Sequence, residues 1–79
     1  YDLSERFYRR ALAMDPASVQ TLNNLGYSLM LQGRHDLALA FLRDAARIDP
    51  DNAMIAANAE RAVAARVEQR GRDLAEAAP

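Results

Sequence analysis

The chain contains no cysteine, so disulfides and thiolate metal sites are excluded and the redox compartment cannot be inferred. Its single histidine, His35, has no second histidine or cysteine with which to hold a metal, and we expect neither a metal nor a cofactor. No uninterrupted apolar run reaches about 18 residues, so we expect no direct membrane insertion. No signal sequence is visible, and the compartment stays open between cytoplasm and periplasm.

The composition points to helices rather than to a polyanion-binding or disordered chain. Every one of the ten basic residues is arginine, and the net charge is −1, which gives no reason to expect a nucleic acid partner. Glycine and proline are rare, at three each, whereas 51% of the 79 residues are hydrophobic. This composition favours helices in a single domain. Because the chain starts at Tyr1 without a methionine, we expect it to be a piece of a longer protein.

An internal repeat is the most informative positive feature. The dipeptide Asp15-Pro16 recurs 34 residues later as Asp49-Pro50. A period of this length is typical of stacked helical repeats, in which no unit can bury its apolar face alone. Such arrays present a concave surface that usually binds another protein. The residues that recur with the dipeptide are Asp2, Leu3, Phe7, Arg9 and Ala11, which match Asp36, Leu37, Phe41, Arg43 and Ala45.

Apolar periodicity and stop signals together predict four helices. Each Asp-Pro step ends a helix, because a residue before proline is pushed out of the α region. Ser18 and Asn52 are good N-caps for the helices that follow these steps. Gly33 ends the second helix by accepting a left-handed conformation. The predicted helices cover about 3–14, 19–32 and 36–48, with a fourth that begins near 53.

The apolar stripes predict which faces are buried. Leu22, Leu25 and Leu29 share one face of the second helix. Phe7 and Phe41 occupy the same repeat position in the first and third helices, and we expect both in the core. The complete stripes of these two helices are Leu3, Phe7, Ala11 and Met14, and Leu37, Phe41, Ala45 and Ile48.

The fourth helix departs from the repeat. A shift of 34 residues from the turn residue Gly33 lands on Val67, and no glycine follows until Gly71. We therefore expect a longer helix over 53–71. The tail over 72–79 either prolongs this helix after a kink or frays, with disorder near the end.

The segment 19–52 resembles one complete tetratricopeptide repeat. Its small residues Gly26 and Ala38 fall where two antiparallel helices of that family touch, and a bulky residue there would cost about 1–3 kcal/mol. Residues 1–18 resemble the second helix of a preceding, truncated repeat, and 53–71 a capping helix with Glu60 in place of the glycine. The resemblance implies an all-α solenoid of antiparallel helix pairs. The other residues that carry it are Leu22, Leu25, Leu29, Leu42, Ala45 and Pro50.

In this family the first helix of each pair lines the concave face, and the resemblance therefore implies a set of groove residues. Asn24 and Asn58 would stack as an amide ladder that bonds a peptide backbone, unless Asn24 is merely solvated and Asn58 has no particular role. Tyr27 and Arg61 suit an interface and an acidic ligand group, respectively, although Arg61 could simply pair with a neighbouring carboxylate. We predict that the partner-binding residues are Asn24, Tyr27, Asn58, Arg61, Gln20 and Asn23. Further inward positions are Met30, Leu31, Met54, Ala57, Ala64 and Ala65, of which Met30 and Met54 could equally fill the core.

Three other candidate functional sites have weaker support in the sequence. A clamp for a terminal carboxylate is not expected, because Met54 and Asn58 stand where cations are required. His35 is expected to be a turn residue packed over the turn. The cluster Arg6, Arg9 and Arg10 is either a basic contact patch or a solvated face balanced by acidic neighbours.

We therefore predict a non-catalytic protein–protein interaction module that binds a peptide or a partner helix. No carboxylate pair, nucleophile–base couple or phosphate loop suggests an enzyme. The alternative is a scaffold segment of a larger assembly, such as a bacterial pilus or secretion system, that self-associates through an uncovered first helix. The stretch 23–52 also resembles repeat lipoproteins of tight-adherence pilus assembly, which would imply a periplasmic parent protein.

Overall fold

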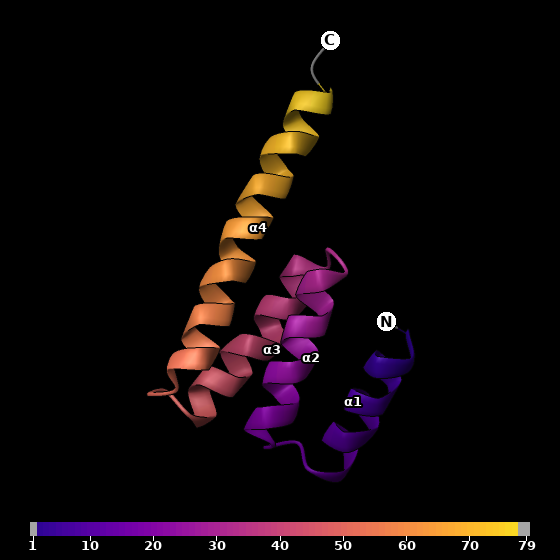
Figure 1. The fold of residues 1–79 in the computed structure, drawn as a ribbon, viewed down its shortest axis with the longest axis vertical. Coiled ribbons are helices and arrows are strands. Elements are labelled where there is room, and N and C mark those ends of the chain that lie inside the picture. Colours follow the sequence, from indigo (N-terminus) through magenta and orange to yellow (C-terminus); the bar gives the residue numbers. More distant parts are fainter. Residues whose placement is uncertain (1, 78–79) are drawn as a thin grey trace.

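Four α-helices follow one another along the chain, and consecutive helices run in opposite directions (Figure 1). The computed structural model describes residues 2–77, and no β-strand occurs within that range. Helix α1 lies at one edge, α2 and α3 in the middle, and α4 at the other edge (Figure 1). The predicted all-α stack of antiparallel helix pairs is confirmed. The helices are α1 (Asp2–Met14), α2 (Val19–Leu31), α3 (His35–Ile48) and α4 (Ala53–Ala77).

Side-chain caps begin α2 and α4, as predicted. The Oγ of Ser18 accepts a hydrogen bond from the N–H of Thr21 at 3.3 Å. The Oδ1 of Asn52 accepts from the N–H groups of Met54 and Ile55 at 3.0 and 3.2 Å. Each cap satisfies backbone donors that have no partner inside the helix. Both helices therefore begin at the residue that the Asp-Pro steps indicated.

Gly33 forms the turn between α2 and α3 in the left-handed conformation, with φ of 80°. Its N–H donates to the carbonyl of Met30 at 3.0 Å, and the N–H of Arg34 donates to the carbonyl of Leu29 at 2.9 Å. This pair of bonds is a Schellman motif, which satisfies the last carbonyls of α2. The sharp turn brings α3 back along α2.

The core lies mainly between α2 and α3. Leu25, Leu29 and Leu42 are fully buried there. A Cβ added to Gly26 would lie 2.6 Å from Leu42 Cγ and 3.3 Å from the Ala38 carbonyl oxygen. The predicted close contact of the two helices at Gly26 and Ala38 is therefore confirmed.

Helix α1 packs with a different face from the one that its apolar stripe indicated. The prediction that Phe7 is a core residue is wrong, because its side chain is 69% exposed. Tyr8 and Leu12 face α2 instead, and they pack against the cluster that contains Leu25 and Leu29. Phe41 is half-buried because it packs against the same cluster and Arg9 of α1 lies over its ring. No helix among residues 2–77 covers Phe7 in the corresponding way.

Helix α4 is longer than predicted and runs through Gly71 to Ala77. Of the two outcomes left open for the tail, the structure shows continuation of the helix as far as residue 77, whereas Ala78 and Pro79 lie outside the described residues. The buried residues of α4 are all in its first half. Its second half projects beyond the other helices (Figure 1). Glycine is tolerated at position 71 because the site is exposed and no atom packs against it. The buried residues are Ile55, Asn58 and Ala62.

Candidate partner-binding groove

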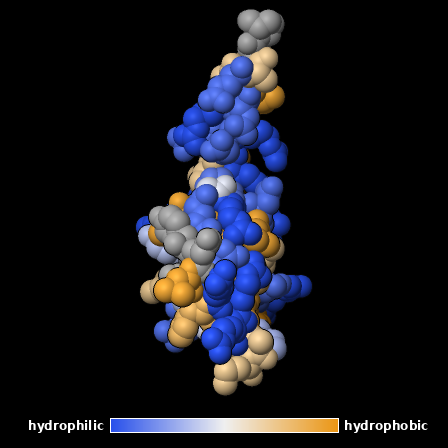
Figure 2. All heavy atoms as spheres, turned by 90° about the vertical axis from the view of Figure 1, so that its right-hand side faces the viewer, coloured by the Kyte–Doolittle hydropathy of each residue, from blue (hydrophilic) through white to orange (hydrophobic). Residues whose placement is uncertain are grey.

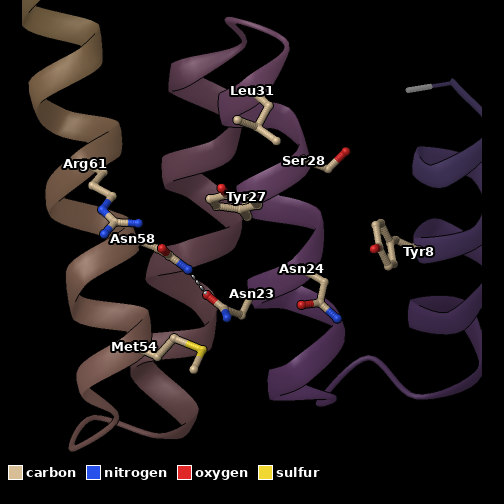
Figure 3. A pocket seen from close by; sticks show the side chains of 9 residues that line it. All are labelled: Tyr8, Asn23, Asn24, Tyr27, Ser28, Leu31, Met54, Asn58 and Arg61. Atoms are coloured by element: carbon tan, nitrogen blue, oxygen red, sulfur yellow. Dashed lines mark hydrogen bonds between the residues drawn. The ribbon is translucent and has the colours of Figure 1, made fainter.

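A groove, hereafter the concave groove, runs along α2 between α1 and α4 (Figure 3). Residues of α2 at spacings of three and four share its middle, because such residues lie on one side of a helix. Residues of α4 at the same spacings form one wall, and a single residue of α1 forms the other. The lining residues are Tyr8, Asn23, Asn24, Tyr27, Ser28, Leu31, Met54, Asn58 and Arg61.

The floor of the groove is a pair of buried amides. The Nδ2 of Asn58 donates to the Oδ1 of Asn23 at 3.0 Å, and the two residues are only 8% and 9% exposed (Figure 3). A buried amide needs such a partner, because burial without a hydrogen bond costs the full free energy of desolvation. The pair therefore links α2 to α4 and sets the distance between them.

This pairing differs from the predicted amide ladder. Asn58 was expected to stack in register with Asn24, at the same repeat position 34 residues earlier, but it bonds Asn23, which is 35 residues earlier. Asn23 points into the α2–α4 contact, whereas Asn24 is exposed on the groove side facing Tyr8 (Figure 3). Asn23 and Asn58 therefore build the floor, and Asn24 is left as the accessible amide.

Three predicted residues meet at the open side of the concave groove. Asn24, Tyr27 and Arg61 are all exposed, with Tyr27 at 40%. Arg61 is the only charged residue of the lining, and it forms no salt bridge with any other described residue. An exposed guanidinium without a salt-bridge partner can bind an acidic group of a ligand. The lining offers amide, phenol, hydroxyl and guanidinium groups, which suit recognition by hydrogen bonds.

Five other predicted positions lie outside the lining of the concave groove. Gln20 is exposed but lines a smaller hollow with Asn52 and Met54, outside the concave groove. Met30 is half-buried and packs against the core clusters, which decides its role as a core residue. The alanines Ala57, Ala64 and Ala65 do not line the groove.

Tyr8 and Ser28 were missed as groove residues. The resemblance implied a groove lined by the first helix of each pair. Tyr8 was missed because it belongs to α1, which corresponds to the second helix of a pair. Tyr8 occupies the repeat position of the buried Leu42. A tyrosine in place of an aliphatic residue is the signal that could have found it, since its hydroxyl requires a polar or exposed surrounding. Ser28 follows Asn24 by one turn and could have been found from spacing alone.

An ion-pair network holds α1, and therefore Tyr8, in position. The Oε2 of Glu5 lies 2.7 Å from Arg34 Nη1, across the gap between α1 and the α2–α3 turn. The Oε1 of Glu5 accepts from Arg9 Nε at 3.0 Å. The hydrogen bond from Arg9 holds the pKa of Glu5 below its usual value; partial desolvation opposes this, and the charge of Arg34 adds to the lowering. Arg9 also lies over the ring of Phe41, 5.5 Å from its centroid.

The arginines of the α1 cluster therefore have two different environments. Arg9 is balanced by Glu5, as the solvated-face interpretation expected, whereas Arg6 and Arg10 lie exposed beside the uncovered apolar residues of α1. His35 was predicted in the turn and is instead the first residue of α3, with Nδ1 buried and unpaired. No group of three or more potential metal ligands occurs in the part of the chain that the structure describes.

Helix pairs stacked around a concave groove define a helical-repeat module for protein–protein interaction. The family model described as tetratricopeptide repeat matches residues 1–53, and the chain belongs to that family, as the repeat pattern predicted. The match ends where α4 begins and where the repeat pattern breaks. Comparison with curated proteins and with solved structures finds no match, so the likeness to pilus-assembly lipoproteins stays a prediction. None of the helices within residues 2–77 combines the length and the apolar character needed to cross a bilayer.

Proposed function

We propose that the concave groove binds an extended peptide segment of a partner protein and that the segment carries an acidic group. The observation that supports this proposal is the convergence of Asn24, Tyr27 and Arg61 on one open groove. All three side chains are exposed, so their identities are not explained by packing in the core. The α2–α4 contact is held by Asn23 and Asn58 instead.

Each of the exposed side chains has a distinct role in this proposal. Asn24 bonds the peptide backbone, because an amide offers both donors and an acceptor. Arg61 bonds a carboxylate of the peptide, and no acidic residue of the lining competes with that carboxylate for the guanidinium. Tyr8 and Tyr27 stand on either side of Asn24 and contact apolar peptide side chains (Figure 3). The module itself performs no catalysis.

Selection from a random peptide library on the immobilised chain tests this proposal. We expect enriched peptides to share an Asp, a Glu or a free C-terminal carboxylate. Arg61→Ala should weaken binding of these peptides by about 10-fold or more, since a charge-assisted hydrogen bond contributes about 1.5–3 kcal/mol. Arg72→Ala is the matched control, because Arg72 is an exposed arginine of α4 outside the groove. Enrichment of peptides without acidic groups, or equal affinity of the two variants, would contradict the proposal.

A second candidate function is a scaffold that self-associates through α1. It is favoured by the exposure of Leu3, Phe7 and Met14 at 82%, 69% and 89%, since uncovered apolar residues gathered on one face mark an interaction site. Sedimentation over a range of concentrations tests it, with Phe7→Ser as the variant. A chain that stays monomeric at every concentration would exclude this function.

A further inference from the structure

A second hollow, hereafter the end hollow, lies between the beginnings of α2 and α4 and has a volume of about 290 Å³. Its most deeply buried lining residue is Ile55, which is 1% exposed, whereas Gln20 is exposed. Asn23 and Met54 line both the end hollow and the concave groove, so the two adjoin. The lining residues of the end hollow are Val19, Gln20, Asn23, Asn52, Met54 and Ile55.

The end hollow suits an apolar group better than an anion. Most of its lining surface is apolar, with Val19, Met54 and Ile55 as its apolar residues. No cationic side chain is among the lining residues. The N–H groups that an anion could use at the start of α4 are already engaged, because those of Met54 and Ile55 donate to Asn52 Oδ1 at 3.0 and 3.2 Å. An apolar group that enters the hollow leaves water, which is favourable.

The two ends of the concave groove differ in the surface that follows them. The end hollow, with the core residue Ile55, adjoins one end. At the other end the lining finishes with Leu31, and the projecting half of α4 beyond it presents mainly hydrophilic side chains toward the edge formed by α1 (Figure 2). Apolar surface backed by the core therefore lies next to the groove at the end that carries Asn23 and Met54.

The size and the place of the end hollow indicate its occupant. Its volume of about 290 Å³ lies just below the range of about 300–1,000 Å³ that is usual for pockets that hold a separate small molecule. A peptide that follows the concave groove past Arg61 reaches the hollow at Asn23 and Met54. We propose that the end hollow receives one apolar side chain of the acidic peptide that the concave groove binds. This inference rests on the proposed function and gives the same site a second specificity position.

Positions along α4 predict how far the apolar residue of the peptide lies from the acidic one. Arg61, which bonds the acidic group, follows the α4 residues of the end hollow by six to nine positions. That separation is roughly 9–14 Å along a helix, and an extended peptide advances about 3.3 Å per residue. The guanidinium of Arg61 is directed back toward Asn58, which shortens the distance (Figure 3). The apolar residue should therefore stand about two to four positions from the acidic residue.

Two exposed side chains of the end hollow can adapt to the entering group. Met54 is 67% exposed and has an unbranched, polarisable side chain, which adjusts to apolar groups of different shape. Gln20 carries amide donors and an acceptor for the backbone of the peptide. We therefore expect the hollow to accept leucine, isoleucine, methionine and phenylalanine rather than one of them alone.

A second peptide library tests the inference, with one Asp fixed in the middle and randomised positions on both sides. Selection on the immobilised chain should enrich apolar residues two to four positions from the Asp, always on the same side of it. Replacement of that residue by Ala in an enriched peptide should weaken binding by about 10-fold, as measured by fluorescence polarisation. The same replacement at the equivalent distance on the other side of the Asp is the control and should change the affinity by less than about twofold.

Blocking the end hollow provides the matched experiment on the protein. Gln20→Trp places an indole ring next to the hollow, and the position is exposed, so the variant should keep the fold, which circular dichroism verifies. It should bind the enriched peptide about 10-fold more weakly than the original chain does, but the Ala-replaced peptide equally well. Ala56→Trp is the control and should bind like the original chain, because Ala56 is exposed on α4 and lines neither the end hollow nor the concave groove.

The possible results separate this inference from the proposed function. Enriched peptides without an apolar preference at two to four positions would overturn the inference, while weaker binding by Arg61→Ala would still support the proposed function. An Ala replacement in the peptide that weakens binding equally for the original chain and for Gln20→Trp would overturn the inference as well, since the apolar side chain would then lie elsewhere. Failure to enrich any peptide, or equal binding by the original chain and Arg61→Ala, would remove both.

Discussion

The side chains of Asn23 and Asn58 are hydrogen-bonded to each other across 3.0 Å, inside the contact between α2 and α4. Both are buried, and the bond spans the space between α2 and α4, one turn along these helices from Tyr27 and Arg61 (Figure 3). The groove therefore has a polar floor in which the Nδ2 of Asn58 and the Oδ1 of Asn23 already have a partner within the protein.

Asn58→Ala should destabilise the fold by about 1–3 kcal/mol, because it leaves the buried carbonyl oxygen of Asn23 without a donor. Urea unfolding followed by circular dichroism measures this loss. Asn24→Ala is the matched control and should change the free energy of unfolding by less than about 0.5 kcal/mol, since Asn24 is exposed. Similar effects of the two variants would contradict the assignment of the floor.

Gly26→Ala should destabilise by about 1–3 kcal/mol through overpacking, because its Cβ would lie 2.6 Å from Leu42 Cγ. Gly71→Ala provides the opposite case within the same chain. No atom lies within 4 Å of a Cβ at that helical position, so alanine there should stabilise by about 0.5–1 kcal/mol. Thermal unfolding of the two variants checks both signs. A neutral Gly26→Ala would mean that α2 and α3 are not in close contact.

Acidification should loosen α1. The folded-state pKa of Glu5 is lowered, so its stabilising contribution is complete above its usual value of about 4.3 and is lost as pH falls through the lowered pKa. Amide hydrogen exchange in α1 should therefore speed up, relative to α2 and α3, below about pH 4.3. In Glu5→Gln this selective change should disappear. Equal acid sensitivity of α1 in both proteins would show that Glu5 does not hold the helix in place.

Gly33→Ala should destabilise by about 1–2 kcal/mol, because φ of 80° is strained for any residue with a Cβ. No atom lies within 4 Å of the added Cβ, so the effect reports backbone strain alone. Chemical denaturation measures it. Gly33→Asn should lose less stability, since asparagine tolerates the left-handed region better than alanine. An alanine variant as stable as the original would contradict the Schellman turn.

Most of the fold could be predicted from local signals. The recurrence of Asp-Pro, the caps Ser18 and Asn52 and the turn at Gly33 act within a few residues, so the sequence alone locates the ends of the first three helices and the starts of α2 and α4. The contact at Gly26 could also be predicted, because only a small residue permits it. These are cases in which local preference and tertiary packing agree.

Burial and helix length depended on neighbours that the pattern does not report. Phe7 and Phe41 are equivalent in the repeat, but within residues 2–77 α1 lies over Phe41, through Arg9, whereas no helix covers Phe7. A glycine such as Gly71 ends a helix where the chain must turn back to form the next one. No helix follows α4 within residues 2–77, and α4 continues past Gly71. A repeat position therefore predicts which face a residue occupies, not whether another helix covers that face.

The candidate site could be predicted in part for the same reason. The family resemblance implied that Asn24, Tyr27 and Arg61 face the concave side, and all three line the concave groove. Their role in binding a partner stays a prediction. The pairing of Asn58 with Asn23 rather than its alignment with Asn24 depends on how α4 is rotated against α2, and a difference of one residue decides it. Tyr8 of α1 packs its ring against the cluster of Leu25 and Leu29 and also lines the groove, because a tyrosine ring favours apolar neighbours and its hydroxyl a polar or exposed site.

Chemical-shift mapping of a selected acidic peptide on the isotope-labelled chain tests the central claim most directly. We predict that the largest shifts occur at Asn24, Tyr27 and Arg61, and that they vanish when the acidic residue of the peptide is replaced by its amide. Shifts confined to exposed residues of α3 outside the groove, such as Ala40, Arg43 and Arg47, would contradict binding in the concave groove. Shifts that the replacement leaves unchanged would contradict it as well.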